Sequence, residues 1–238
     1  KYIVLLASIG FLFAAANSPQ PDPEENTAVI PTPREGRAYE RFLMLNERVR
    51  KNQGNVDLLF VGDSITERWE KNGKDVWNEF YGHRKALNIG ISADRTQHVL
   101  WRLDHGNIEG ISPKVTVLLI GTNNSGLDRN TTSETLEGVY AVVEKLQTEL
   151  PDTKILLLGI FPRGKEFNEQ RGKITQVNQI LQKMDEREGI RYLNIGHVFL
   201  ESDGSISEEI MPDALHLSPE GYRLWAEAME PHLKERLN

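Results

Sequence analysis

Five short aliphatic runs alternate along this chain with stretches that repeat apolar residues at helical spacing. The runs cover residues 56–61, 85–89, 115–120, 155–160 and 190–195, each about the length of a β-strand. The helical stretches cover residues 37–51, 75–81, 93–104, 133–150, 168–188 and 218–237. Strands separated by crossover helices run parallel, with helices on both faces. The alternation therefore predicts an α/β fold, a three-layer α/β/α sandwich around a five-stranded parallel sheet.

Composition narrows the chemistry that this chain can carry out. The 238 residues include no cysteine, which excludes disulfides, thiolate zinc sites, iron–sulfur clusters and cysteine nucleophiles. The 28 Lys and Arg residues against 35 Asp and Glu residues leave a net charge of −7, and the sequence has no Lys or Arg run of the kind that follows a phosphate backbone. We therefore expect no nucleic-acid partner, and reactive groups that are oxygen or imidazole.

The N-terminal residues 1–16 have the pattern of a secretory signal peptide. Lys1 is followed by an apolar stretch of about 15 residues that ends in small residues of the A-x-A type. A spanning helix needs about 20 apolar residues, and a core helix would not precede a polar, proline-rich stretch. An uncleaved N-terminal anchor and a core helix are the alternatives. The pattern favours export to a periplasm or the extracellular space, with no stable membrane insertion after signal cleavage.

Residues 17–36 hold five prolines and only two large aliphatic residues, Val29 and Ile30. Such a composition is typical of an extended, poorly ordered tether. From Arg37 onward apolar residues recur at spacings of three and four, which marks one face of an amphipathic helix. One folded domain over residues 37–238 is therefore predicted, since single domains commonly hold about 100–200 residues.

Polar residues gather directly after the predicted strands and before the last helix. The first strand is followed by Ser64, the second by Gly90 and the third by Asn123. In a parallel sheet these positions lie at one edge, outside the carboxyl ends of the strands. Asp213 and His216 precede the final helix, and their spacing lets one turn present both side chains together. A serine, a histidine, a carboxylate and donors for an oxyanion are therefore expected on one rim.

Each of these residues also has an ordinary structural role to weigh. Ser64 could cap a helix, Gly90 could supply a positive φ angle to a turn, and Asn123 could satisfy loop backbone groups. Asp63, which adjoins Ser64, is interpreted as a turn residue rather than as a catalytic acid. The order and number of these residues, more than any one of them, favour a serine acyl-transfer site.

Four blocks of this sequence resemble those of the SGNH (GDSL-type) serine hydrolases. The blocks are Gly62-Asp63-Ser64-Ile65, Asn88-Ile89-Gly90, Gly121-Thr122-Asn123-Asn124 and Asp213-Ala214-Leu215-His216. They stand in the order that the family shows, and the similarity runs from about residue 37 to residue 237. Within the family, the stretches 99–124, 158–164 and 202–206 are most similar to the intracellular platelet-activating-factor acetylhydrolases.

The resemblance implies a flavodoxin-like SGNH hydrolase fold and a role for each block. Ser64 would be the nucleophile, His216 the general base and Asp213 the carboxylate that orients the imidazole. The oxyanion hole would consist of the N–H groups of Ser64 and Gly90 and the side-chain amide of Asn123. No metal or organic cofactor is expected for this chemistry.

The expected function is that of an exported serine carboxylester hydrolase that removes short acyl groups, acetyl above all, from a small-molecule or glycan ester. A phospholipid acetylhydrolase, a lysophospholipase-like lipase, an arylesterase or thioesterase, and an acyltransferase remain open within the enzyme class. A noncatalytic carbohydrate-binding protein on the same fold is the alternative from another class. The family resemblance also makes a homodimer an expectation.

Overall fold

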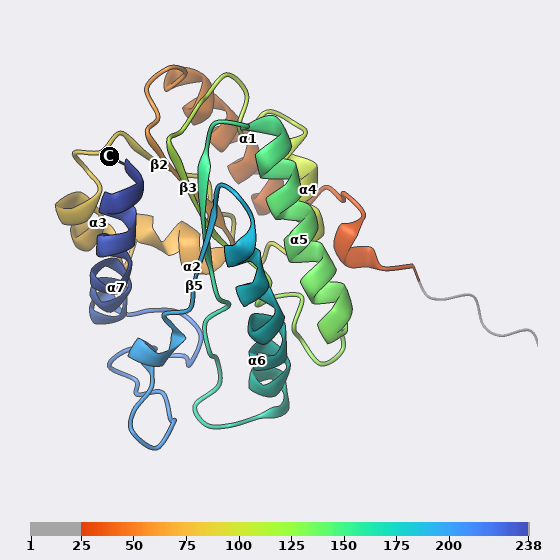
Figure 1. Ribbon diagram of the computed structural model, residues 1–238, viewed down its shortest axis with the longest axis vertical. Coiled ribbons are helices and arrows are strands. Elements are labelled where there is room, and N and C mark those ends of the chain that lie inside the picture. Colours follow the sequence, from red (N-terminus) through yellow and green to blue (C-terminus); the bar gives the residue numbers. More distant parts are fainter. Residues whose placement is uncertain (1–24, 238) are drawn as a thin grey trace, which may run out of the picture.

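A five-stranded parallel sheet forms the centre of the molecule (Figure 1). The computed structural model describes residues 25–237. The strands are β1 (Leu58–Gly62), β2 (Ala86–Asn88), β3 (Val115–Leu119), β4 (Lys154–Leu158) and β5 (Ile190–Leu193). They pair in the order β2-β1-β3-β4-β5, and every neighbouring pair is parallel. The predicted α/β fold with five parallel strands is confirmed.

Helices cover both faces of the sheet and complete the three layers (Figure 1). One face carries α1 (Arg37–Lys51), α4 (Thr96–Leu103), α5 (Thr132–Glu149) and α6 (Glu169–Leu181). The other face carries α2 (Ser64–Glu67), α3 (Lys74–Phe80) and α7 (Pro219–Leu237). Short 3₁₀ helices occupy Thr27–Val29, Arg68–Glu70, Gln182–Glu186 and Gly196–Phe199.

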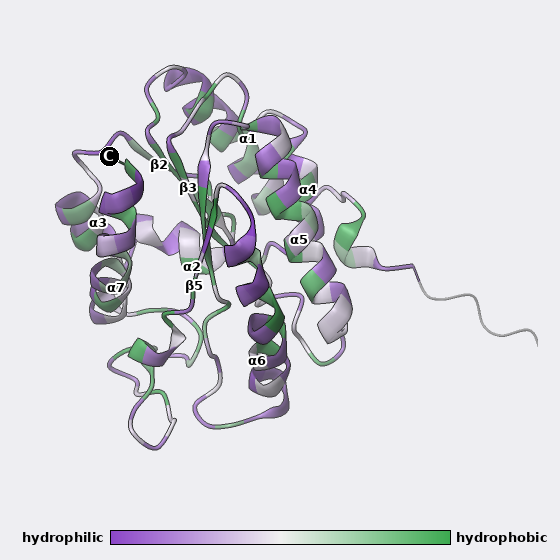
Figure 2. Ribbon diagram, in the orientation of Figure 1, coloured by the Kyte–Doolittle hydropathy of each residue, from purple (hydrophilic) through white to green (hydrophobic). Residues whose placement is uncertain are grey.

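Each strand contributes to two hydrophobic cores, because successive side chains point to opposite faces of a sheet. In β1, Leu59 and Val61 join the core on the α1 side, whereas Leu58 and Phe60 join the core on the α7 side. Every residue of β1 and β3 is buried, which explains why these strands read as continuous aliphatic runs. Most helices show both hydrophilic and hydrophobic colours in Figure 2, as expected for helices with one face on a sheet.

Three helical elements differ from the sequence prediction. The helix expected over residues 93–104 begins only at Thr96, because Ala93 has a φ of +63° and cannot continue a right-handed helix. The single-turn helix α2 was not predicted, since four residues are too few to show an apolar repeat. The helix expected over residues 168–188 ends as an α-helix at Leu181 and continues as a 3₁₀ turn.

The described part of the predicted tether, residues 25–36, packs on the domain. Ala28 is fully buried, and its carbonyl accepts a hydrogen bond of 2.7 Å from Thr96 Oγ1. The Thr32 N–H donates to the Gln97 carbonyl at 3.1 Å. These contacts bind the segment to α4, so the folded unit begins before α1. The expectation of an extended spacer is corrected for these residues, because proline content does not reveal which neighbours a segment meets.

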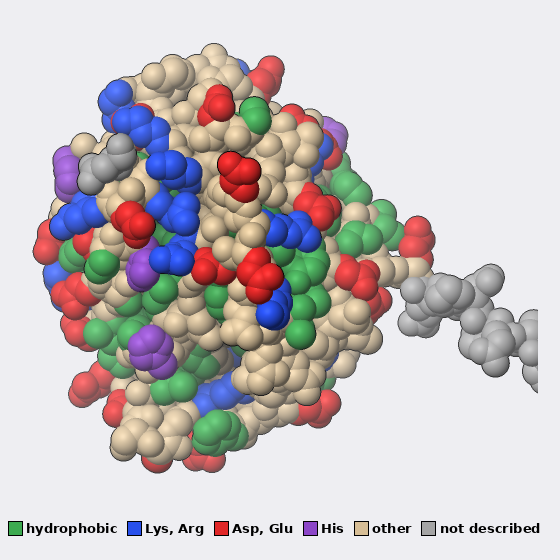
Figure 3. Space-filling view, viewed as in Figure 1, with side chains coloured by type: hydrophobic (Ala, Val, Ile, Leu, Met, Phe, Trp, Pro, Cys, Tyr) green, Lys and Arg blue, Asp and Glu red, His purple; other side chains and the backbone are tan. Residues whose placement is uncertain are grey.

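The predicted signal peptide, residues 1–16, lies outside the described residues. Between residues 25 and 237, no helix has both the length and the apolarity needed to cross a bilayer. Acidic and basic side chains are interspersed over the face in Figure 3, with Lys and Arg gathered near the C-terminal end of the chain.

The strand order directs attention to one crevice of the sheet. After β1 the chain forms β2 on one side and then crosses to form β3 on the other. The connections that leave β1 and β3 therefore diverge, and ligands of doubly wound sheets bind where this happens. The connection after β1 carries Ser64, and the one after β3 carries Asn123.

Candidate active site

Ser64 is the first residue of α2, immediately after β1. The Asp63 side chain caps this helix, since its Oδ1 accepts a hydrogen bond of 3.0 Å from the Ile65 N–H. Tyr222 of α7 donates from its hydroxyl to the Ile65 carbonyl at 2.6 Å. The Ser64 N–H has no hydrogen-bond acceptor among residues 25–237. α2 is thus anchored at its first turn by two independent contacts, and Ser64 is held with it.

The turn before α7 brings His216 and Asp213 to Ser64. His216 Nε2 lies 2.9 Å from Ser64 Oγ, and His216 Nδ1 lies 2.6 Å from Asp213 Oδ2. Asp213 Oδ1 accepts hydrogen bonds from the N–H groups of Leu215 and His216, at 3.2 and 2.7 Å. Ala214 takes a φ of +54° within this turn. The structure therefore joins the three residues predicted from the sequence in one hydrogen-bonded series.

The environment of Asp213 favours its charged form. Partial burial raises the pKa of Asp213, but the hydrogen bonds from the ring and the backbone of His216 outweigh that effect, and the pKa is lowered overall. A charged carboxylate beside Nδ1 favours the imidazole tautomer with the proton on Nδ1. His216 Nε2 then presents a lone pair to the Ser64 hydroxyl.

Gly90 lies beside α2, but its N–H is not available to an oxyanion. That N–H already donates to Asn88 Oδ1 at 2.8 Å. A Cβ atom on Gly90 would lie 2.4 Å from the Glu67 nitrogen and 2.9 Å from the Asp63 carbonyl oxygen. Only a glycine allows the segment after β2 to approach α2 so closely. The predicted oxyanion role of Gly90 is therefore corrected to one in packing.

The N–H of Ala93, three residues after Gly90, is an available donor among residues 25–237. Ala93 is exposed, and its N–H has no hydrogen-bond acceptor within the described part of the chain. Together with Asn123 it lines an open hollow of about 590 Å³. Asn123 Nδ2 donates to the Asp94 carbonyl at 2.9 Å, and its second amide hydrogen has no acceptor among residues 25–237. Sequence reasoning missed Ala93 because a left-handed backbone at a residue other than glycine leaves no signal in composition.

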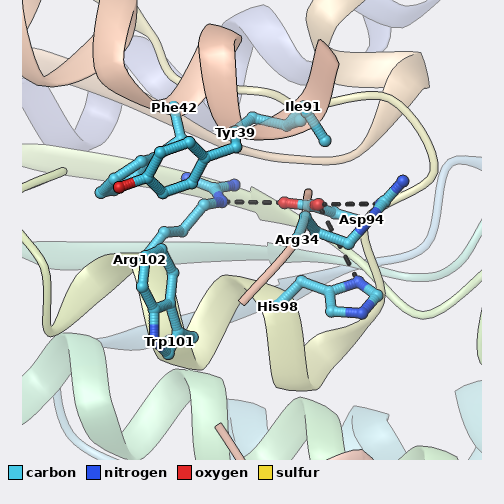
Figure 4. Close-up of a pocket in the computed structure, with 9 residues that line it drawn as sticks. Arg34, Tyr39, Phe42, Ile91, Asp94, His98, Trp101 and Arg102 are labelled. Carbon is cyan, nitrogen blue, oxygen red and sulfur yellow. Dashed lines mark hydrogen bonds and ion pairs between the residues drawn. The ribbon is translucent and has the colours of Figure 1, made fainter. Parts of the chain in front are cut away.

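A buried ion pair between Arg102 and Asp94 links the end of β1 to the segment after β2 (Figure 4). Arg102 Nε donates to Asp94 Oδ2 at 2.9 Å, and Arg102 Nη2 donates to the Gly62 carbonyl at 3.1 Å. Arg34 reaches the other carboxylate oxygen of Asp94 at 3.4 Å. Burial raises the pKa of Asp94 to about 6, against the charge of Arg102. Because Gly62 ends β1, the pair ties the strand before the serine to the segment after β2.

The cavity beside this ion pair differs in kind from the hollow at Asn123. Its volume is about 10 Å³, about enough for one water molecule, and the rings of Tyr39, Phe42 and Trp101 form part of its wall. It is a gap in the packing and is too small for a substrate. Among residues 25–237, no group of three or more His, Asp and Glu side chains is arranged to hold a metal ion.

Comparisons with known proteins reveal the relatives of this chain. The GDSL-like lipase/acylhydrolase family matches residues 60–224. Platelet-activating factor acetylhydrolase IB subunit alpha2 of Rattus norvegicus is 42% identical over 167 residues, which are 70% of this chain and 71% of the relative. The alpha1 subunit of Homo sapiens is 36% identical over 203 residues, 84% of this chain and 86% of the relative. A GDSL-like lipase structure from Bacteroides thetaiotaomicron has a TM-score of 0.66 at 20% identity, covering 83% of this chain and 97% of that one.

The fold and the matched region define the class of this protein as a carboxylic ester hydrolase. The match begins in β1 and ends in α7, so it includes Ser64, Asn123, Asp213 and His216. The chain belongs to the GDSL-like lipase/acylhydrolase family, and the resemblance inferred from its four sequence blocks is confirmed.

Proposed function

We propose that this chain is an exported serine hydrolase that removes short acyl groups, above all acetyl, from carboxylic esters. The observation that carries the proposal is the series Ser64, His216 and Asp213, with 2.9 Å and 2.6 Å between successive polar atoms. A histidine that bonds a serine hydroxyl on one side and a carboxylate on the other is the arrangement that activates serine as a nucleophile. The family membership supports the same reaction class.

In the first half of the reaction Ser64 is acylated. His216 Nε2 removes the proton from Ser64 Oγ while that oxygen forms a bond to the ester carbonyl carbon. The tetrahedral intermediate then breaks its bond to the alcohol oxygen, and His216 gives the proton to the leaving alcohol. Asp213 stabilises the imidazolium in between. In the second half, His216 activates a water molecule that attacks the acyl-enzyme, and the carboxylic acid and free Ser64 are released.

The oxyanion of the tetrahedral intermediate needs donors that are in place beforehand. We assign this role to the N–H groups of Ser64 and Ala93 and to the side-chain amide of Asn123. Neither N–H has an acceptor among residues 25–237, and one hydrogen of the Asn123 amide is uncommitted. Ala93 takes the place that the sequence assigned to Gly90.

The names of the relatives support the acyl group and the remainder of the substrate to different degrees. The relatives at 42% and 36% identity are named acetylhydrolases, which supports acetyl as the acyl group. Because their names also specify platelet-activating factor, a phospholipid acetylhydrolase is the second candidate. A noncatalytic carbohydrate-binding protein has less support, since such a protein does not need the hydrogen-bonded series at Ser64.

Hydrolysis of p-nitrophenyl esters from acetate to palmitate by the full chain tests the proposal. We expect cleavage confined to the shortest esters, and no burst of p-nitrophenol or turnover in Ser64→Ala. Ser202→Ala, in an exposed turn, is the matched control and should retain full activity. A preference for long chains would favour the lipase alternative. Turnover that survives in Ser64→Ala would contradict the serine mechanism.

We propose export of this protein from the sequence of residues 1–16 alone. Their apolar stretch and small-residue exit support cleavage after residue 16. Expression of the full chain in a bacterium with two membranes, followed by fractionation and N-terminal sequencing, checks this. Mature protein in the periplasm or medium is expected. Uncleaved chain in the inner membrane would support the anchor alternative, and uncleaved chain in the cytoplasm would contradict export.

A further inference from the structure

The hollow beside Asn123 and Ala93 is lined by three arginines. Arg34 comes from the segment before α1, Arg95 immediately precedes α4, and Arg129 lies in the loop before α5. The residues that line this hollow include a single carboxylate, that of Glu35. A concentration of positive charge in a chain with a net charge of −7 needs a physical reason, because like charges that lie close together repel.

The three guanidinium groups differ in how far the protein itself satisfies them. Arg34 reaches Asp94 Oδ1 at 3.4 Å, and Arg129 Nε lies 3.8 Å from the exposed carboxylate of Asp128. The Arg95 guanidinium has neither a hydrogen-bond acceptor nor an ion-pair partner among residues 25–237, although it is only partly exposed. Within the described residues, Arg95 is thus a cation without a counter-ion at the wall of the hollow.

The surroundings of Arg95 destabilise its positive charge, so a bound anion would stabilise it. Burial lowers the pKa of Arg95, and the charges of Arg129 and Arg34 lower it further. His98 also lines the hollow, and its Nδ1 accepts a hydrogen bond of 3.0 Å from the backbone N–H of Arg95. Burial lowers the pKa of His98 to about 3. His98 is therefore neutral at physiological pH, and the positive charge belongs to the arginines alone.

We propose that this hollow is a subsite that binds an anionic group of the substrate, with Arg95 as its principal ligand. The inference rests on the proposed function, because it places the anion next to the ester that Ser64 cleaves. Asn123 and Ala93 line the hollow and also supply two of the three proposed oxyanion donors, so the hollow adjoins the position proposed for the ester carbonyl oxygen. The planar fork of a guanidinium suits a carboxylate or a phosphate equally.

This subsite narrows the substrate class. The alcohol part of the ester should carry a carboxylate, as in an acetylated uronic acid, or a phosphate, as in an acetylated sugar phosphate or a phospholipid. A neutral acetylated sugar would leave Arg95 without its counter-ion and should be a poorer substrate. The segment that was expected to be a tether takes part in this selection, because it contributes Arg34 and Glu35 to the wall.

Matched substrates measure the selectivity. We compare kcat/KM of the full chain for acetylated methyl glucuronoside, acetylated glucose 6-phosphate and acetylated methyl glucoside. At least one charged substrate should be favoured over the neutral one by about tenfold or more, as expected for one charge-assisted pairing, and the preferred one identifies the source of the anion. In Arg95→Ala this ratio should fall towards one, and in Arg95→Lys it should recover in part. Arg187→Ala, an exposed arginine before β5 at the opposite edge of the sheet, should leave the ratio unchanged.

When esters are cleaved, two outcomes would overturn the subsite and leave the hydrolase assignment standing. Equal kcat/KM for charged and neutral substrates contradicts the subsite while leaving the hydrolase intact. A charge preference that persists in Arg95→Ala and in Arg95→Ala/Arg129→Ala also contradicts it. If no ester is cleaved at all, calorimetry with glucuronate and with inorganic phosphate decides: binding that Arg95→Ala abolishes supports the subsite, and absence of binding overturns it.

Discussion

Asp63 combines a structural task with an unusual ionisation. Its side chain is fully buried and caps α2 through Oδ1, while Oδ2 has no hydrogen-bond partner among residues 25–237. Burial raises the pKa of Asp63 to about 7, against the hydrogen bond from the Ile65 N–H. The sequence interpretation of Asp63 as a turn residue agrees with this capping role, and the carboxylate that contacts His216 is Asp213.

The raised pKa of Asp63 predicts a pH-dependent stability. The unfolded chain releases this proton near pH 3.9, whereas the folded protein keeps it until about pH 7. The folded state therefore binds more protons in this window, and the free energy of unfolding should fall as pH rises from about 4 to about 7, by at most about 4 kcal/mol from this group. Asp63→Asn should flatten that slope.

Urea denaturation at pH values from 4 to 8 measures this effect as the difference between the wild-type protein and Asp63→Asn. The difference removes the contribution of Asp94, whose raised pKa acts in the same direction. Asp152→Asn, at an exposed position, serves as the control and should run parallel to the wild-type curve. Parallel curves for Asp63→Asn as well would show that Asp63 is ionised in the folded protein at acidic pH.

At the scale of elements, the position of α2 depends on how closely the segment after β2 approaches it. Asn88 Nδ2 donates to the Thr66 carbonyl at 2.8 Å, and Arg41 Nε donates to the Gly90 carbonyl at the same distance. The Ser92 N–H donates to Glu67 Oε2 at 2.6 Å. These contacts hold the short helix against the segment that carries Ala93. A helix of one turn owes its stability to such contacts rather than to its own propensity.

Gly90→Ala tests this arrangement. The new methyl group would lie 2.4 Å from the Glu67 nitrogen, so α2 or the segment must shift. We expect a loss of about 1–3 kcal/mol in stability, as is usual for overpacking, together with a steep loss of esterase activity because Ser64 moves with α2. The measurements are chemical denaturation and p-nitrophenyl acetate hydrolysis.

Gly172→Ala in α6 provides a matched control for this substitution. A Cβ atom there meets nothing within 4 Å, so the change should keep activity and raise stability by about 0.5–1 kcal/mol. Full activity and unchanged stability in Gly90→Ala would show that the segment yields easily, and would contradict the packing role assigned to Gly90.

At the scale of the whole molecule, the N-terminal segment is part of the folded unit. Ala28 fits against α5 where Gly138 leaves room, since a Cβ on Gly138 would lie 3.0 Å from the Ala28 Cβ. Asn130 Nδ2 donates to Thr27 Oγ1 at 3.0 Å. The segment therefore contacts both α4 and α5 on the outer side of that helical layer.

A chain that begins at Arg37, the domain boundary predicted from the sequence, should be less stable than the full chain. Removal of the segment takes away the carbonyl that accepts from the buried Thr96 hydroxyl and exposes the surface under Ala28. We expect a loss of about 2–4 kcal/mol in the free energy of unfolding, as for two or more buried hydrogen bonds that lose a partner. Denaturation of the two chains side by side measures it. Equal stability would support the tether interpretation.

The fold class followed from the sequence alone, and the sequence alone also predicted Ser64, Asp213, His216 and Asn123 as candidate site residues. The patterns behind these predictions are local: aliphatic runs, their order in the chain and the D-x-x-H spacing. Local patterns can be recognised in the sequence itself. The carboxyl ends of parallel strands share one edge of the sheet, and this rule predicts that these distant blocks lie close together.

The parts of the site that depend on contacts between distant segments became visible only in the folded chain. In the described part of the chain, the N–H of Ala93 has no acceptor whereas that of Gly90 does, and this follows from backbone conformation and from the side chain of Asn88. The meeting of Arg34, Arg95 and Arg129 at one hollow depends on three separate connections folding towards the same edge. Hydrogen-bond partners and close approaches are set by the whole packing, and no short sequence pattern specifies them.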